Sequence, residues 1–329
     1  MKFYLNKQKT NKLDLTKGLK GYFNSDDTDK TKVYTIYWEW PFDSGENNQD
    51  DINYQNKDIL VDVKVVGKQS PGHAIMMNGD ITEHSDKTTT VGMWKDEYRL
   101  KIKNITFSND LSNLPSSCTE ANLCWDITDS ESIYPVYHYL VQNETDTTKY
   151  DAYIVSEEKI YAPKDSSGIF ALYGEESGSY VSYVETINFN NNFDTSKVTN
   201  MGSLFQGSAA LETLDLSNFD TSKVTNMRAM FGGTSASGDM HLKEIKVSDK
   251  FVTDNVTDML EMFRLCRYLN FTFNVTGNKV TNYTNIFNNT ATDSNAKIIV
   301  NYTAETETLV DNMLATVAST SNVVKGKQI

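Results

Sequence analysis

Apolar side chains recur at helical spacing through the second half of the chain. Val198, Met201, Leu204 and Phe205 occupy positions i, i+3, i+6 and i+7, which share one face of a short helix. The pair Thr199–Asn200 lies at the start of this pattern, where side-chain oxygens accept hydrogen bonds from the free N–H groups of a helix. The sequence therefore predicts a short capped helix here. The same pattern begins again at Val224, Val256 and Val280.

A strand signal precedes each predicted helix. Leu211, Leu214, Leu216 and Phe219 follow the spacing Leu-x-x-Leu-x-Leu-x-x-Phe, which is a leucine-rich-repeat spacing with Phe in the position usually taken by Asn or Cys. Related apolar sets are Val184/Ile187/Phe189, Leu242/Ile245/Val247 and Tyr268/Phe271/Phe273. A last, atypical unit comprises Ile298, Val300, Leu309, Met313 and Val317.

The repeats are partly literal copies. Residues 193–201 (FDTSKVTNM) return letter for letter as residues 219–227. The first valines of the four units are 26, 32 and 24 residues apart, so the third unit follows an insertion near Gly232–Met240. Units of this length cannot bury an apolar face alone and stack on their neighbours. We therefore predict an α+β solenoid with a short strand and a short helix in each repeat, closed by a capping unit.

The motif FDTSKVTNMxxLF, preceded by a strand of the form xLxxLDLSN, resembles the BspA-like leucine-rich repeat of bacterial surface proteins. Trp94–Phe107, Trp125–Thr128 and Tyr150–Ile154 resemble the region that precedes the repeats in the same family. The resemblance covers roughly residues 90–329. It implies a surface-exposed, adhesive module and implies no chemistry.

The N-terminal region shows a different pattern. Val33–Trp40 and Ile59–Val66 alternate apolar and polar residues, which is typical of β-strands. With the acidic loop Pro41–Asn56 between them, they resemble strands of the TasA/camelysin-type secreted sandwich of Gram-positive bacteria. The expected organisation is a β-rich, sandwich-like segment over 1–68, a linker over 69–90, a β-rich lead-in that caps the solenoid over 91–183, and repeats over 184–329.

Charge and hydropathy limit the partners and the location. The formal net charge is −13, and an acidic surface disfavours binding to nucleic acid or anionic lipid. No apolar run of about 20 residues is present, so no membrane span is predicted. The first residues lack the apolar run of a signal peptide. Because the repeats resemble surface proteins, we expect an extracellular or cell-surface location, with the export signal and anchor outside this sequence.

Candidate chemistry is sparse, and we expect no enzyme activity. The four histidines lie in separate contexts, and no zinc-protease or nucleophile-elbow motif is present. Cys118 and Cys124 are close enough to close a small loop in an oxidising compartment, whereas Cys266 is expected to be a buried, small apolar side chain.

No cofactor or protein-bound metal is predicted. Calcium is the alternative, because two acidic clusters offer hard oxygen ligands. Their spacing does not fit a calcium-binding loop, and the preferred interpretation is solvated acidic loops. The clusters are Asp26/Asp27/Asp29 and Asp43/Glu46/Asp50/Asp51.

The duplicated polar residues are the candidate binding site. Stacking of repeats would align them into polar ladders along one face, although the same side chains suit turn and capping hydrogen bonds, which is the preferred interpretation. They are Asp194, Ser196 and Lys197 in one copy and Asp220, Ser222 and Lys223 in the next. The expected function is recognition of an extracellular protein or glycan, such as host matrix. The alternative is a structural subunit of a surface fibre or biofilm matrix.

Overall fold

The computed structural model describes residues 93–172, 182–233 and 240–329, together with short strand segments at 2–4, 37–39, 74–77, 82–83, 89–90, 174–176 and 179–181. The chain divides into two compact units, Met1–Gly72 and His73–Ile329. In the first unit, β1 (Lys2–Tyr4) pairs antiparallel with β2 (Tyr37–Glu39). The predicted strand Ile59–Val66, both acidic clusters and most of the predicted linker lie outside the described residues.

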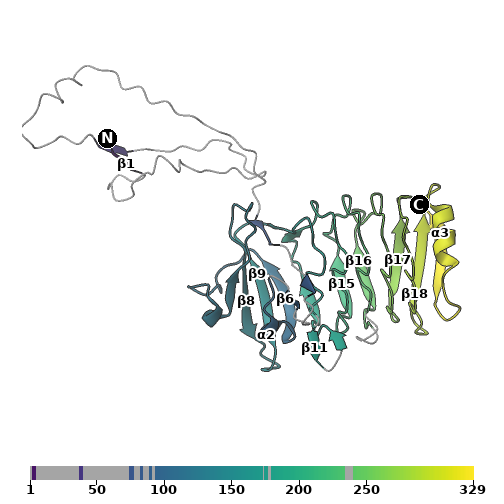
Figure 1. The fold of residues 1–329 in the computed structure, drawn as a ribbon, viewed down its shortest axis with the longest axis horizontal. Helices are drawn as coiled ribbons and strands as arrows, with labels where there is room; N and C mark the ends of the chain where they lie inside the picture. The colour runs from purple at the N-terminus through teal and green to yellow at the C-terminus, as the bar shows by residue number, and fades with distance from the viewer. Residues whose placement is uncertain are drawn as a thin grey trace, which may run out of the picture. The chain divides into compact units, whose positions relative to one another are not determined.

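The second unit begins with a five-stranded sheet of order β13-β6-β9-β8-β7 (Figure 1). β13, β6 and β9 run parallel, whereas β8 and β7 are antiparallel to their neighbours. Four of its strands, β6 to β9, lie in the region expected before the repeats, whereas β13 contains Ile187 of the first strand assigned to the repeats. Its strands are β6 (Ile102–Ser108), β7 (Cys124–Asp126), β8 (Tyr137–Gln142), β9 (Tyr150–Val155) and β13 (Thr186–Asn188).

The repeats form a second five-stranded sheet, which is parallel throughout and has its strands in sequence order (Figure 1). Leu214 and Leu216 are buried whereas Thr213 and Asp215 are exposed, as the two-residue period of a strand requires. The predicted strand in each repeat is confirmed, and these strands are parallel. The strands are β15 (Thr213–Leu216), β16 (Glu244–Val247), β17 (Asn270–Val275), β18 (Lys297–Tyr302) and β19 (Val323–Gln328).

Several short elements complete the unit. β10 lies between β3 and β14 in a parallel sheet, and the pairs β4–β5 and β11–β12 are antiparallel. The strands are β3 (Ala74–Ile75), β4 (Thr82–Glu83), β5 (Thr89–Thr90), β10 (Ile160–Tyr161), β11 (Gly174–Glu176), β12 (Ser179–Val181) and β14 (Phe193–Asp194). The helical elements of the described chain are α2 (Asp96–Arg99), η1 (Glu120–Asn122) and α3 (Glu307–Leu314).

The short helix predicted at each of Val198, Val224, Val256 and Val280 is wrong, whereas the last, atypical unit does contain a helix, α3. The segment that follows Met201 forms consecutive turns, with Ser203 in the left-handed region at φ 55°. The N–H of Ser203 donates to the carbonyl of Arg228 at 2.7 Å, and that of Phe205 donates to Met230 at 2.9 Å. A helix satisfies these groups within itself, whereas here every second N–H bonds to the next repeat. The stacking therefore replaces the helical hydrogen bonds.

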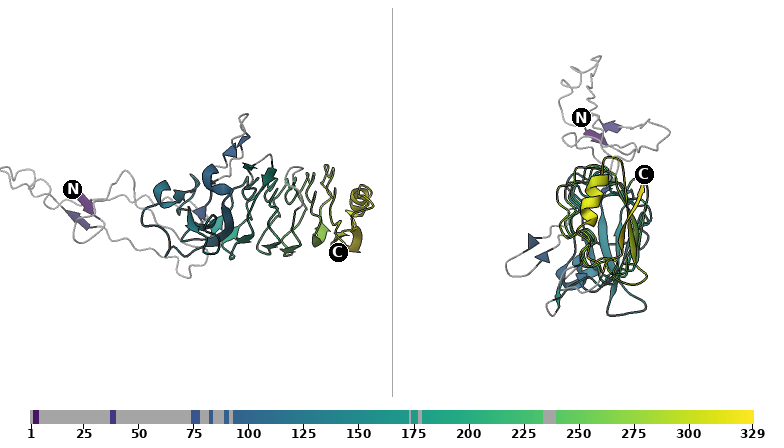
Figure 2. Two further views of the ribbon diagram at one scale, coloured as in Figure 1. Left: turned by 90° about the horizontal axis from the view of Figure 1, so that it is seen from below. Right: turned by 90° about the vertical axis from the view of Figure 1, so that its right-hand side faces the viewer.

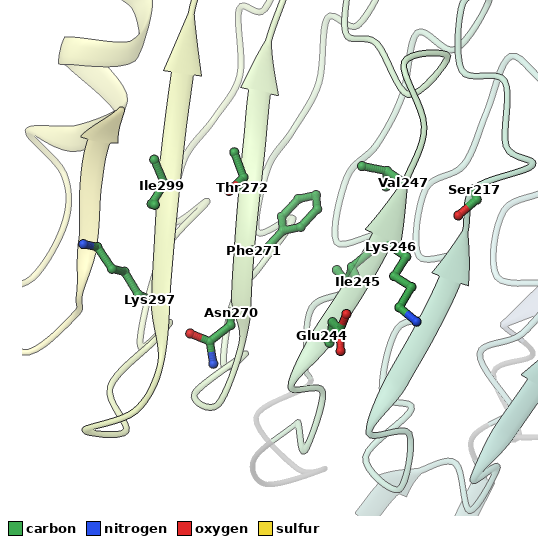
Figure 3. A pocket seen from close by; sticks show the side chains of 10 residues that line it. All are labelled: Ser217, Glu244, Ile245, Lys246, Val247, Asn270, Phe271, Thr272, Lys297 and Ile299. Carbon is green, nitrogen blue, oxygen red and sulfur yellow. The ribbon is translucent and has the colours of Figure 1, made fainter. Parts of the chain in front are cut away.

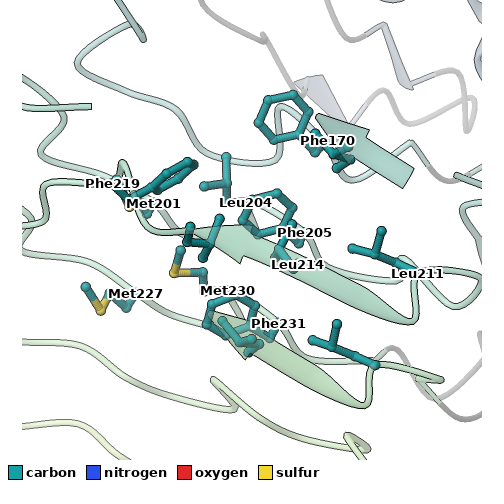
Figure 4. Close-up of a cluster of buried hydrophobic side chains, with 14 of the residues drawn as sticks. Phe170, Met201, Leu204, Phe205, Leu211, Leu214, Phe219, Met227, Met230 and Phe231 are labelled. Carbon is teal, nitrogen blue, oxygen red and sulfur yellow. The ribbon is translucent and has the colours of Figure 1, made fainter. Parts of the chain in front are cut away.

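The prediction that the apolar side chains of this segment point into the core is nevertheless confirmed. Val198, Met201, Leu204 and Phe205 are all buried, at 0–1% exposure. Phe205 belongs to a column of parallel rings in which neighbouring centroids are 5.4–5.9 Å apart (Figure 4). Viewed along the stack, successive repeats of the second unit overlie one another (Figure 2). The column is Phe170, Phe205, Phe231, Phe263 and Phe287.

Candidate binding surface

The duplicated Asp-Thr-Ser-Lys segments lie on neighbouring repeats, and their polar atoms are largely used within the turn. The hydroxyl of Ser196 donates to Asp194 Oδ1 at 2.6 Å, and its N–H donates to the same oxygen at 2.9 Å. In the next copy the N–H of Ser222 donates to Asp220 Oδ1 at 3.0 Å. These contacts are those expected of turn chemistry, which limits what the two aspartates offer to a ligand.

The two lysines of this segment differ in their surroundings. Lys197 is half-buried, and its Nζ lies 4.2 Å from the centroid of the Tyr161 ring. Burial lowers the pKa of Lys197, against the raising effect of the Asp194 carboxylate. Lys223 and Ser222 are exposed. Of the six predicted residues, this exposed pair is the part most open to a partner.

Threonine residues inside the same motif connect the repeats, and sequence reasoning did not single them out. Thr195 is 1% exposed; its hydroxyl donates to the carbonyl of Asp220 at 3.0 Å and accepts from the N–H of Asp220 at 2.8 Å. Thr221 makes the same pair of contacts with the backbone of Val252, at 2.6 and 2.7 Å. The letter-for-letter duplication was the available signal, because it includes both threonines.

The Thr-Asn pairs also form columns across the repeats. The hydroxyl of Thr225 donates to the carbonyl of Thr199 at 3.1 Å. Asn226 forms parallel bridges with Asn200 and Asp258, and its Oδ1 accepts the N–H of Arg228 at 2.9 Å. The predicted capping role of these oxygens is therefore corrected in one respect, because they cap a turn and not a helix.

An open cleft of about 760 Å³ lies on the sheet, between β16 and β17 (Figure 3). The two strands pair at one position, Glu244 with Asn270, where the N–H of Asn270 donates to the carbonyl of Lys243 at 2.8 Å. By contrast, β17 pairs with β18 at six successive positions. The parallel ladder is therefore interrupted between β16 and β17 and nowhere else from β15 to β18.

The cleft is closed again at its far end. The N–H of Thr253 donates to Thr276 Oγ1 at 2.8 Å, and the N–H of Thr276 donates to Thr253 Oγ1 at 2.9 Å. The two strands are joined at the pair Glu244–Asn270 and again at the pair Thr253–Thr276. Between these pairs, Thr253 follows Glu244 by nine residues, whereas Thr276 follows Asn270 by six. The longer arm cannot keep register with the shorter one, which explains why the strands separate.

The lining of the cleft combines an apolar floor with a polar rim. Phe271 and Ile245 are 7% and 6% exposed, and the ring of Phe271 lies between the two strands (Figure 3). The rim carries amide, hydroxyl and charged groups of both signs. Its exposed residues include Glu244, Lys246, Asn270, Thr272 and Lys297. None of the six residues predicted as a polar ladder lines this cleft.

The cysteines separate into a bonded pair and a buried thiol. Cys118 and Cys124 form a disulfide that fastens the loop after β6. Leu111 and Leu114 of that loop pack against a cluster that includes Tyr139 on the sheet. Cys266 is buried as expected, but its Sγ also donates to the carbonyl of Phe231 at 3.2 Å. Burial raises the pKa of this thiol, so no reactive cysteine is indicated.

The described ranges hold no group of three or more His, Cys, Asp or Glu side chains arranged to hold a metal ion. His138 is buried, and His241 lies 5.7 Å from the ring of Tyr268. His73 and His84 lie outside the described residues. Within the same part of the chain, no helix has the length and apolar character needed to cross a membrane.

Residues 179–302 match the model of a family described as "Mycoplasma protein of unknown function, DUF285". The match contains both copies of the duplicated motif, the two weaker units that follow them, and the cleft between β16 and β17. No curated protein and no solved structure matches the chain. The comparisons therefore identify the repeat region and assign it no activity.

Proposed function

We propose that this chain is a cell-surface recognition module that binds an extracellular protein or glycan through its repeat solenoid. The observation that carries the proposal is the open cleft on the repeat sheet, which has an apolar floor and a rim of charged and amide groups. Binding sites commonly combine such a floor with a few polar groups that fix orientation.

The disulfide supports the extracellular location. Disulfides persist in oxidising environments and are rare in the reducing cytosol, and Cys118–Cys124 holds a loop against the sheet before the repeats. The repeat sheet itself supports recognition, because stacked repeats hold side chains at fixed intervals on one extended surface.

Binding of the full chain to immobilised extracellular-matrix proteins and to a glycan array tests the proposal. Saturable binding to one of these partners is the expected result. The double variant Lys246→Glu/Lys297→Glu should weaken it if the cleft is the contact surface. The double variant Lys223→Glu/Lys250→Glu reverses the same number of charges at exposed positions outside the cleft and serves as the matched control. Absence of saturable binding to any protein or glycan would contradict the proposal.

A structural role in a surface fibre is the second candidate. β19 is the outermost strand of the repeat sheet, and an open strand edge is a template for pairing with another chain. Lys327, which is exposed on this strand, acts against such pairing. Light scattering over a range of protein concentrations separates the candidates, because a fibre subunit assembles with increasing concentration and a monomeric receptor does not.

A further inference from the structure

The cleft between β16 and β17 leaves strand backbone open on both sides. In a parallel ladder, alternate residues of a strand direct their backbone groups to the same neighbour. After the pair Glu244–Asn270, the next groups in line are those of Thr272 on β17 and of Val247 on β16. Among the described residues, these positions form no pair across the cleft. Peptide N–H and C=O groups are strong hydrogen-bonding groups, and here they face an open space.

We propose that this cleft binds a short extended peptide, which pairs its backbone with the open strand edges of β16 and β17. The inference rests on the recognition function proposed above and names the class of partner. Strand addition is an established mode of peptide recognition, in which main-chain hydrogen bonds supply affinity and alternate side chains supply specificity.

The dimensions of the cleft set the length of the peptide. Six residue steps separate the closure at Asn270 from the closure at Thr276, which is about 20 Å of extended strand. A segment of about four or five residues fits between the two closures at the same rise per residue. A longer strand would clash with Thr253 and Thr276, which are hydrogen-bonded to each other across the end of the cleft.

The lining indicates the chemistry of that segment. An apolar side chain that points inward meets Phe271 and Ile245 on the floor. Lys246 and Lys297 line the cleft against one acidic residue, Glu244, so an acidic residue beside the apolar one is favoured. The lining offers a sugar ring no well-exposed aromatic face on which to stack, because its aromatic residue, Phe271, is only 7% exposed. The observations therefore favour a peptide over a glycan.

The open edge can be tested in the full chain without a ligand. Backbone amides bonded within a sheet exchange slowly with solvent, and open amides exchange quickly. The N–H groups of Thr272 and Val247 should exchange at least about tenfold faster than those of Phe271 and Phe273, which face β18. Exchange of Thr272 and Val247 as slow as that of Phe271 would show a closed ladder and overturn the proposal.

Binding is tested with a library of random peptides selected on the full chain, followed by fluorescence anisotropy with the selected peptides. Thr272→Pro removes the open N–H and should weaken binding at least about fivefold, the loss expected for one hydrogen bond. Thr272→Ala is the matched control, because it removes the side chain and keeps the N–H, and it should lose clearly less affinity than Thr272→Pro.

The outcomes separate this inference from the proposed function. Equal loss in Thr272→Ala and Thr272→Pro would overturn backbone pairing, as would failure to select any peptide. If Thr272→Pro does not fold, Val247→Pro with Val247→Ala repeats the test on the other edge, and protection of the Thr272 amide by the selected peptide provides a readout that needs no variant. Binding of matrix protein or glycan that is indifferent to Thr272→Pro would leave the recognition function standing and exclude this site.

Discussion

The rings of Phe205 and Phe231 stack with their centroids 5.9 Å apart and their planes 3° from parallel. The two residues are 26 positions apart in the chain and occupy the same place in consecutive repeats. Both are 0–1% exposed. Each ring therefore fills the space between its own turn segment and those of its neighbours, and the column that they form joins the repeats into one core.

Phe231→Ala is expected to destabilise the second unit by about 3–5 kcal/mol, because it removes a buried ring and leaves a cavity between two neighbouring rings. Chemical unfolding followed by circular dichroism measures the loss. Phe231→Leu is the matched control, and it should cost clearly less because most of the apolar volume remains. An unfolding midpoint unchanged by Phe231→Ala would refute the stacked core.

Thr221→Val is expected to cost about 1–3 kcal/mol of unfolding free energy, although the two side chains have the same shape. The hydroxyl of Thr221 serves both the carbonyl and the N–H of Val252, and its loss leaves these groups without that partner in a site where Thr221 is 1% exposed. Thr225→Val is the control, because the hydroxyl of Thr225 is bonded in an exposed position. Equal effects of the two substitutions would show that burial of the hydroxyl is unimportant.

Cys266→Ser is expected to change the unfolding free energy by less than about 1 kcal/mol. The thiol of Cys266 donates to the carbonyl of Phe231. At the corresponding position of the next repeat, the hydroxyl of Thr290 donates to the carbonyl of Phe263 at 2.6 Å, so a hydroxyl group fits this position of the repeat. Cys266→Val retains bulk without a donor and should be the less stable variant.

The native chain should also react with a thiol reagent at Cys266 only after unfolding, since burial raises the pKa of the thiol. Rapid labelling of the native chain would contradict the burial of this residue.

Stability should fall in acid because of His138, which is 1% exposed and lies between the rings of Trp94 and Trp125. Desolvation lowers the pKa of His138 from 6.5 to about 3, against a smaller raising effect of the Met93 backbone. The unfolded chain then binds a proton at higher pH than the folded chain. The stabilisation that comes from keeping His138 neutral is fully present above pH 6.5. It is lost as the pH falls toward 3, by up to about 1.4 kcal/mol of unfolding free energy per pH unit.

Unfolding free energies at pH 7.5 and 5 should differ by about 2 kcal/mol more in the unmodified chain than in His138→Phe. His241→Gln, at an exposed position, is the control and should keep the full difference. An identical pH dependence in the unmodified chain and His138→Phe would show that His138 titrates freely in the folded state.

The repeated units and their buried positions could be predicted from the local sequence pattern. The duplicated motif and the spacing of Leu211, Leu214 and Leu216 indicated stacked units with one strand in each, and these strands are present. The inward positions Val198, Met201 and Phe205 were also predicted correctly. Burial of a repeated apolar position depends on residue type and spacing, which are visible in one copy of the motif.

The predicted helices failed for a reason that lies outside any one repeat. Spacing of i, i+3, i+6 and i+7 is equally compatible with consecutive turns, and the left-handed conformation of Ser203 is stabilised by a bond to Arg228 in the next unit. The role of Thr221 likewise depends on Val252, which is 31 residues away. Such partners are specified by stacking, so local propensity does not reveal them.

The sequence by itself determined that this chain stacks repeated units, which of their side chains turn inward and where strands occur, because these depend on composition and periodicity. Only the tertiary structure decided how the turns are bonded, that Asp194 and Asp220 serve mainly their own turns, and that β16 and β17 separate into a cleft. The cleft arises from a mismatch of three residues between two neighbouring arms. A mismatch of this kind has meaning only when the two arms lie side by side, and stacking is what brings them together.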